Sequence, residues 1–280
     1  MILPRPHRKF CGGGSAGRRC ERAMGCGEVR EKESKDLIDR LPDYEIITIA
    51  GKMTDAMTNE MLGLINLHAN NAILTHSSKI TDQIPRSYAA NSFNIVQVSL
   101  YYSELVWLCK FWDRIDFDKH SIPTVVKLIE KDSILRDLNI KTRSSWSGSN
   151  VDPSLSTDLK ESAIRIEKAF GKKIGDRTTG KVKKAISLSH KIMQSTQLDS
   201  IRNTRDKAVH MLEKTAREKN QGAVHPMKYG YESSILARTR LIIDVFHSSI
   251  NQLSFAWNDS IEFLKRCAEQ LWHNCKFAAQ

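Results

Sequence analysis

The chain has 280 residues, which is enough for one large domain or two small ones with a substantial core. Its 43 lysines and arginines outnumber its 32 acidic residues, and the resulting net charge of +11 favours polyanionic partners. This charge excludes no fold and does not separate RNA from DNA or from a membrane surface. Because no stretch approaches the roughly 18 consecutive apolar residues of a membrane span, the sequence predicts a cytoplasmic protein that makes no use of a membrane.

The first forty residues differ in composition from the rest of the chain. Between Met1 and Arg30 there are seven basic residues, two glutamates and three consecutive glycines, but few apolar residues. Such a segment cannot bury enough apolar surface to order itself. We therefore expect residues 1–40 to be a disordered or weakly ordered basic segment, followed by a single α-helical domain over residues 41–280.

The cysteines give little sign of a metal site or of disulfides. The segment Met1–Arg30 lacks the apolar stretch of a secretory signal peptide, so we expect reduced thiols. Although His7, Cys11, Cys20 and Cys26 could in principle hold zinc, none of the cysteines forms a C-x₂-C knuckle. We expect no metal and no cofactor.

Hydrophobic spacing predicts helices, and no run alternates in the manner of a strand. Ile46–Ser78 is expected to form a long helix. Ser87–Arg114 is the most apolar helix, and a helix that is apolar on most of its surface belongs at the centre of a bundle. Short helical pieces are expected between Val125 and Leu138, and one or two helices over Glu232–Phe277.

Three interruptions are expected between these helices. Asn139–Thr157 is poor in helix formers and should be a loop, in which Trp146 either folds back on the core or contacts a ligand. After a helix over Leu159–Phe170, the glycines and lysines of Gly171–Thr179 predict a hairpin-like basic break. Five lysines in and after this break could contact phosphates, but a solvated basic helix start is the better explanation for each one taken singly; they are Lys172, Lys173, Lys181, Lys183 and Lys184. A further loop over Asn220–Gly230 contains His225, which could reach a nearby site.

The stretch Leu198–Lys219 contains no glycine or proline and is predicted to be one helix. Its expected core-facing stripe consists of Ile201, Thr204, Ala208, Met211, Leu212 and Thr215. Arg202, Asp206 and His210 follow one another at intervals of four residues and therefore share a different face. With Arg205 beside them, this face would carry a histidine, a carboxylate and two arginines away from the core.

Three interpretations fit this polar face. It could be a solvated basic surface in which Asp206 pairs with its arginine neighbours. It could hold phosphates without chemistry. It could also be catalytic, because an imidazole exchanges protons near neutral pH and an arginine stabilises charge that develops on a phosphoryl group.

The run from Arg205 to His210 resembles the signature of the HEPN superfamily, an arginine, then Asn, Asp or His, and then a histidine a few positions on. A similar arginine-to-histidine spacing recurs in three other places, namely Arg114 to His120, Arg240 to His247 and Arg266 to His273. Only Arg205 is followed by one of the polar residues that the signature requires.

A second resemblance covers the region from Leu62 to Leu138. An apolar helix that ends in Phe111-Trp112-Asp113-Arg114 and is followed by Ser121-Ile122-Pro123-Thr124 is similar to abortive-infection, AbiU-like proteins of the HEPN type. The resemblance implies an all-α, HEPN-like up-and-down helical bundle that is dimeric. It also implies RNA, a second copy of the chain and conceivably an antitoxin protein as partners.

The function implied by the resemblance is that of a metal-independent endoribonuclease in a toxin or phage-defence system. His210 would act as general base or acid, Arg205 would stabilise the charge on the phosphorane-like transition state, and Asp206 would orient these groups. Further RNA contacts are expected from Arg202, Asn203, Lys207 and Lys214. The alternative is a catalytically silent helical scaffold that binds RNA or protein.

Overall fold

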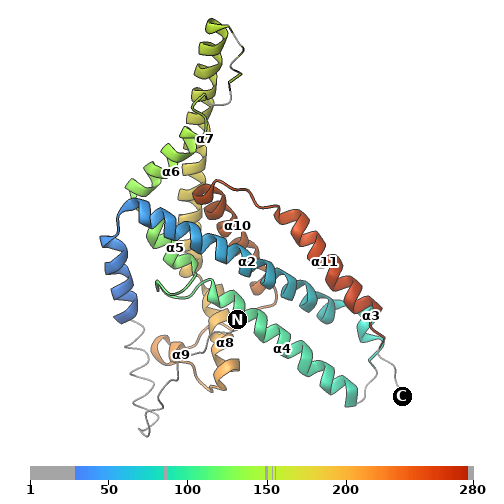
Figure 1. Ribbon diagram of the computed structural model, residues 1–280. Coiled ribbons are helices and arrows are strands. Elements are labelled where there is room, and N and C mark those ends of the chain that lie inside the picture. Colours follow the sequence, from blue (N-terminus) through green and yellow to red (C-terminus); the bar gives the residue numbers. More distant parts are fainter. Residues whose placement is uncertain (1–28, 85–87, 149–150, 153, 155, 277–280) are drawn as a thin grey trace, which may run out of the picture.

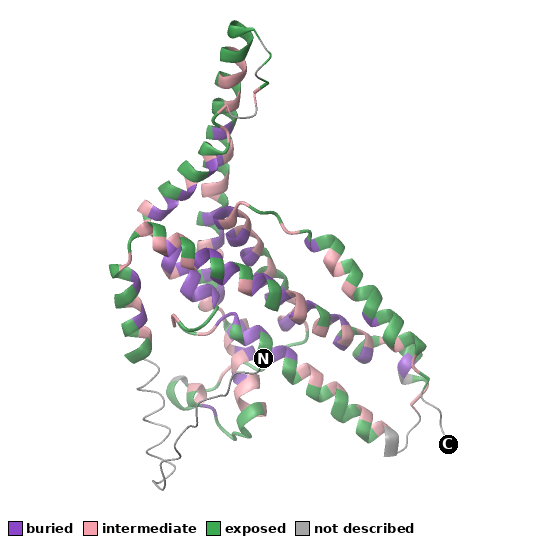
Figure 2. Ribbon diagram, in the orientation of Figure 1, coloured by how far each residue is buried: buried purple, intermediate pink, exposed green. Residues whose placement is uncertain are grey.

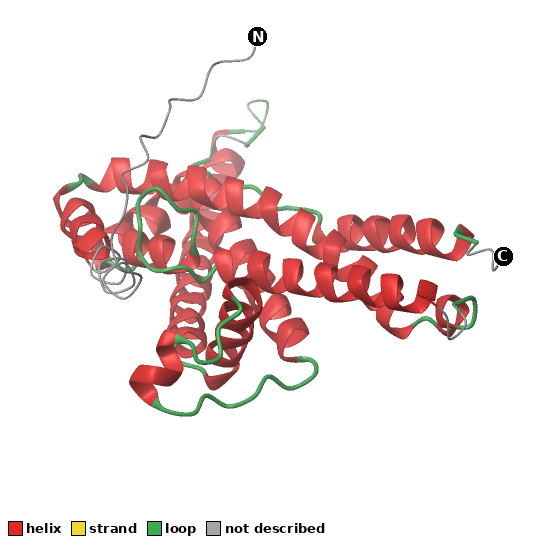
Figure 3. Ribbon diagram, turned by 90° about the horizontal axis from the view of Figure 1, so that it is seen from below, coloured by secondary structure: helices red, strands yellow, loops and turns green. Residues whose placement is uncertain are grey.

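Helices make up nearly all the regular structure of this chain. A computed structural model describes residues 29–84, 88–148, 151–152, 154 and 156–276, and in these residues there is no strand (Figure 3). The prediction of an all-α protein is confirmed. After a helix over residues 29–40, the helices are α2 (Asp43–His76), α3 (Ser78–Thr81), α4 (Tyr88–Lys110), α5 (Ile122–Ile129), α6 (Asp132–Ser144), α7 (Thr157–Met193), α8 (Thr196–His210), α9 (Ala216–Gln221), α10 (Tyr231–Asn251) and α11 (Trp257–Asn274).

Helix α2 is central to the bundle and packs against α4, α5, α10 and α11 (Figure 1). Met57, Met61 and Leu64 recur at helical spacing on its buried face and are fully enclosed. Ile38, in the helix before α2, is also fully buried in this core. The predicted disordered segment therefore extends too far, since residues 29–40 are helical and packed; residues 1–28, with His7, Cys11, Cys20 and Cys26, lie outside the described residues.

The prediction that the most apolar helix lies at the centre of the bundle is only half right. The C-terminal half of α4 is enclosed, with Leu105 and Leu108 fully buried. Its N-terminal half extends beyond the bundle and leaves apolar side chains exposed, among them Ile95, Val96 and Val98 (Figure 2). The helix is apolar on all sides, so a single chain leaves one of its faces uncovered.

The segment after α4 forms the short helices that its sequence predicts. Ser121 caps α5 by accepting a hydrogen bond from the backbone N–H of Thr124 at 3.4 Å, and Pro123 lies in the first turn. Helix α6 then continues to Ser144, so the predicted loop over Asn139–Thr157 begins too early.

Helix α7 is continuous, and the hairpin-like break predicted over Gly171–Thr179 is wrong. The glycines are there because α6 approaches closely. A Cβ atom on Gly171 would lie 2.6 Å from the Cβ atom of Trp146, and one on Gly175 would lie 2.9 Å from Cγ of Arg143. Trp146 folds back onto α7, where its ring meets that of Phe170 edge-on at 4.9 Å. The N-terminal half of α7 extends beyond the bundle (Figure 1).

The predicted single helix over Leu198–Lys219 is instead two helices, α8 and α9. Met211 ends α8 in the left-handed conformation, with φ 50° and ψ 41°, and its side chain is 93% exposed. Met211 and Leu212 therefore do not belong to the core stripe, whereas Ile201 does. Thr215 starts α9 with a capping box that involves Glu218.

The last part of the chain is two helices, as expected. α10 and α11 both pack against α2 and are joined by residues 252–256. None of the helices in the described ranges combines the length and apolar character that crossing a membrane requires.

Candidate functional site at the end of helix α8

Helix α8 is held firmly at its start. The hydroxyl of Ser195 accepts a hydrogen bond from the backbone N–H of Leu198 at 3.2 Å, and Leu198 and Ile201 are fully buried. The helix packs against α4 and α10. Its polar side chains are therefore carried on a rigid element.

Arg205 and Asp206 form a close pair on α8. Nε and Nη2 of Arg205 donate hydrogen bonds to Oδ1 of Asp206 at 2.9 and 2.6 Å. Arg217 approaches from α9, with Nη1 3.8 Å from Oδ2 of Asp206 and Nε 3.4 Å from Oδ1 of Asp199. Nη1 of Arg217 is buried and has no hydrogen-bond partner among the described residues.

Arg202 joins the site to the end of α4. Its guanidinium donates a hydrogen bond to the backbone carbonyl of Trp112. Burial lowers the pKa of Arg202, and the charges of Arg217 and Arg205 lower it further, because the three guanidinium groups lie close together. We call Arg202, Arg205 and Arg217 the arginine cluster. Its neighbouring carboxylates are those of Asp199 and Asp206, and the charge of Asp113 also acts on Arg205.

A second set of contacts fixes the turn between α8 and α9. Asn203 is buried; its amide nitrogen donates to Oε1 of Glu218 at 3.1 Å, and its oxygen accepts from the hydroxyl of Thr215. Nζ of Lys207 lies 2.7 Å from Oε1 of Glu218. The hydrogen bonds from Lys207, the backbone of Thr215 and Asn203 lower the pKa of Glu218 to about 2. We call Asn203, Lys207, Thr215 and Glu218 the α8–α9 clasp.

His210 is the last residue of α8 and is exposed. Within the part of the chain that the structure describes, its imidazole has no hydrogen-bond or ion-pair partner. Five residues separate it from Arg205, which places the two side chains about 140° apart around the helix. The carboxylate of Asp206 contacts arginines and not His210. One chain therefore brings Arg205 and Asp206 together but leaves His210 apart from them.

The other residues expected to contact RNA occupy different surroundings. Lys214 is exposed in the turn between α8 and α9. Asn203 and Lys207 line a cavity of about 410 Å³ between α8 and the loop over residues 222–230, and His225 lines the same cavity. The backbone oxygen of His225 accepts a hydrogen bond from the buried hydroxyl of Ser200 at 2.7 Å, which ties the loop to α8.

Sequence reasoning missed Arg217, Asp199 and the carbonyl of Trp112. On an uninterrupted helix Arg217 would lie about 18 Å along the axis from Arg205. The reversal at Met211 brings it back instead. Burial raises the pKa of the nearby Cys109 thiol to about 11, which disfavours the nucleophilic thiolate form. No group of side chains suited to hold a metal ion occurs among the described residues.

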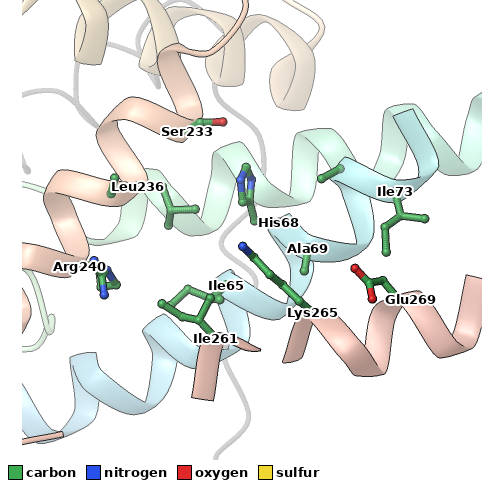
Figure 4. Close-up of a pocket in the computed structure, with 12 residues that line it drawn as sticks. Ile65, His68, Ala69, Ile73, Ser233, Leu236, Arg240, Ile261, Lys265 and Glu269 are labelled. Atoms are coloured by element: carbon green, nitrogen blue, oxygen red, sulfur yellow. The ribbon is translucent and has the colours of Figure 1, made fainter. Parts of the chain in front are cut away.

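A larger cavity, of about 490 Å³, lies between α2, α10 and α11 (Figure 4). Its wall contains His68, whose Nδ1 is 2.7 Å from Oε1 of the buried Glu104. This hydrogen bond raises the pKa of His68, and burial of the imidazole acts in the opposite direction. Asn71 holds the other oxygen of Glu104 at 2.6 Å. None of the residues that the sequence identifies as site residues lines this cavity. It is therefore separate from the arginine cluster.

Comparison with known protein families identifies a relationship for most of this chain. Residues 47–271 match the model of a HEPN family described as AbiU2. The match begins within α2, ends within α11 and includes α8 with the arginine cluster. Neither the curated proteins nor the solved structures include a match to this chain.

Proposed function

Because the chain belongs to the AbiU2 family of HEPN proteins, which is linked to abortive infection, we propose that it is a metal-independent endoribonuclease of a toxin or phage-defence system. The site would be formed by Arg205, Asp206 and His210. The observation that carries the proposal is the pairing of Arg205 with Asp206 in a cluster of three arginines, four positions before the exposed His210, whose imidazole has no partner among the described residues.

The arginine cluster is suited to a phosphate group. Guanidinium groups bind phosphate through paired N–H donors, and they remain charged at any pH of interest. Asp206 holds Arg205 through two hydrogen bonds, so the guanidinium is oriented before a substrate arrives. This contact supports an orienting role of Asp206 toward Arg205; within one chain Asp206 makes no contact with His210.

The proposed reaction needs no metal ion. A neutral His210 takes the proton of a ribose 2′-hydroxyl as the oxygen attacks the adjacent phosphorus. The P–O5′ bond breaks, and the leaving oxygen takes a proton from an imidazolium, giving a 2′,3′-cyclic phosphate and a 5′-hydroxyl. Arg205 stabilises the additional negative charge of the transition state, a contribution typically worth about 10²–10³ in rate. DNA lacks the internal nucleophile and would not be cut.

A base and an acid are both required, and each chain supplies one His210. We propose that two copies of the chain place their motifs in a common cleft, with two His210 and two Arg205 side chains around one phosphate. The exposed apolar residues of α4 support a second copy, because α4 packs on α8 and carries uncovered Ile95, Val96 and Val98. Covering such a surface is the usual driving force for association.

The test compares Arg205→Ala and His210→Ala with Arg266→Ala and His273→Ala. The second pair is another arginine followed by a histidine on one helix, seven positions apart instead of five, and both side chains are exposed on α11. We expect the first pair to abolish cleavage of total RNA in EDTA and the second pair to leave it unchanged, with the helical circular-dichroism signal preserved in all four. Equal loss in both pairs, or no loss in the first, would contradict the assignment.

The second candidate is a silent scaffold that binds RNA or protein. One observation favours it: two donors of Arg205 are already used by Asp206, and a phosphate would have to compete for them. Salt-dependent RNA binding by wild type without any cleavage in EDTA would support the scaffold.

A further inference from the structure

Because α7 is one continuous helix, basic residues on both sides of the predicted break at Gly171–Thr179 lie on the same face of it. Between Thr157 and Met193 the helix carries ten lysines or arginines and four acidic residues. Five of the basic residues fall within an arc of about 80° around the helix. They are Lys173, Arg177, Lys181, Lys184 and Lys191, which we call the basic ridge. All five are exposed.

No acidic residue of α7 falls within this arc. In the described part of the chain none of the five ridge residues has an ion-pair partner, whereas Lys183, on another side of the helix, faces Asp132 at 4.0 Å. The ridge extends over about 27 Å from its first residue to its last. A row of uncompensated charges of this length repels itself, and a bound polyanion would relieve that repulsion.

An aromatic side chain continues the ridge toward the projecting end of α7. Phe170 precedes Lys173 by nearly one turn, lies within the same arc and is 47% exposed. Its other side is supported by the ring of Trp146 at 4.9 Å. A positive surface that follows a backbone, with an aromatic ring on which a base stacks, is the usual pattern of proteins that bind single-stranded nucleic acid.

We propose that the basic ridge binds the backbone of single-stranded RNA and that Phe170 stacks on one of its bases. The choice of RNA rests on the proposed function, but the ridge is separate from the residues proposed for cleavage. Lys191, the last residue of the ridge along the chain, lies five residues before α8 begins. RNA that follows the ridge to this end would therefore reach the start of α8, the helix that carries Arg205 and His210.

The experiment measures binding without cleavage. The probe is a fluorescently labelled 20-nucleotide RNA in which every ribose is 2′-O-methylated, so that no internal nucleophile exists, and binding is followed by anisotropy at several salt concentrations. The ridge variant combines Lys173→Gln, Arg177→Gln, Lys181→Gln and Lys184→Gln. The matched control combines Lys160→Gln, Lys168→Gln, Lys172→Gln and Lys183→Gln, which removes the same charge from exposed positions of α7 outside the arc.

We expect the ridge variant to bind more weakly than the control and to show a salt dependence that is shallower by roughly 2.8 in the slope of log K against log salt, about 0.7 for each lost phosphate contact. Phe170→Leu should reduce affinity about fivefold or more and leave the slope unchanged, since stacking involves no phosphate. Circular dichroism confirms that each variant is folded.

Three results would overturn the proposal. The first is equal weakening in the ridge variant and the control, which would indicate a diffuse charge effect. The second is wild-type affinity in the ridge variant. The third is ridge-dependent sedimentation with phosphatidylserine vesicles while RNA binding is unaffected, which would make the ridge a membrane-binding surface. The binding measurements do not depend on cleavage. RNA binding by the ridge and RNA cleavage at Arg205 and His210 can therefore each be disproved without the other.

Discussion

The guanidinium of Arg202 on α8 donates a hydrogen bond to the backbone carbonyl of Trp112 at the end of α4. This contact joins the two regions that resemble abortive-infection proteins of the HEPN type, the Phe111–Arg114 segment and the helix that carries Arg205. It places the arginine cluster against the enclosed half of α4. The position of the candidate site therefore depends on Arg202 as a structural residue.

Arg202→Met should destabilise the fold by about 1 to 3 kcal/mol, because the carbonyl of Trp112 loses its hydrogen-bond partner in a partly buried place. Urea denaturation of the variant and wild type measures the difference. The control is Lys214→Met, which removes the same charge from an exposed position and should change the unfolding free energy by less than about 0.5 kcal/mol. Equal effects would show that Arg202 contributes nothing beyond its charge.

The α8–α9 clasp predicts a pH dependence. The pKa of Glu218 is lowered in the folded protein from its ordinary 4.5 to about 2. Between these values the unfolded chain binds the proton more readily, so stability from the clasp is complete above about pH 4.5 and is lost as the pH falls toward 2. The stability difference between wild type and Glu218→Gln should therefore shrink on acidification. A difference that is constant with pH would contradict this account.

Two glycine-to-alanine substitutions in α7 should change the stability of the fold in opposite directions. Gly171→Ala places a Cβ atom 2.6 Å from Cβ of Trp146 and should cost about 1 to 3 kcal/mol through overpacking. Gly180→Ala meets no atom within 4 Å and should instead stabilise the helix by about 0.5 to 1 kcal/mol. Thermal and urea denaturation report both values. Stabilisation by both alanines would mean that α6 does not pack closely on α7.

The shared cleft predicts that one defective copy inactivates a dimer. Because the base and the acid are the two His210 side chains, a mixed dimer of wild type and His210→Ala has only one imidazole at the phosphate. Adding an excess of His210→Ala to wild type under conditions of reversible dissociation should therefore reduce RNA cleavage. Mixed dimers that form, as native mass spectrometry would show, yet keep full activity would contradict the two-copy site.

The sequence predicts the long helices well, because periodic apolar residues such as Met57, Met61 and Leu64 specify both helix and buried face. It does not predict the breaks. Gly171 and Gly175 read as helix breakers, yet they serve the close approach of α6 within a continuous helix. Met211 carries no turn signal, yet it ends α8 in a left-handed conformation that side chains other than glycine seldom adopt.

The candidate site, like the fold, can be predicted from the sequence only in part. The residue types and spacing at Arg205, Asp206 and His210 identify the motif, and the match over residues 47–271 confirms the family. The reversal that brings Arg217 to Asp206, and the contact of Arg202 with Trp112, depend on tertiary structure and leave no local signal. Whether Arg205, Asp206 and His210 act in catalysis stays a prediction.

The most direct test of the account is cleavage, in EDTA, of one RNA and of the same sequence 2′-O-methylated throughout, by wild type and by His210→Ala. The account predicts that wild type alone cuts, that it cuts only the unmodified RNA, and that the products end in a 2′,3′-cyclic phosphate. Cleavage of the methylated strand, or equal cleavage by the His210→Ala variant, would contradict it.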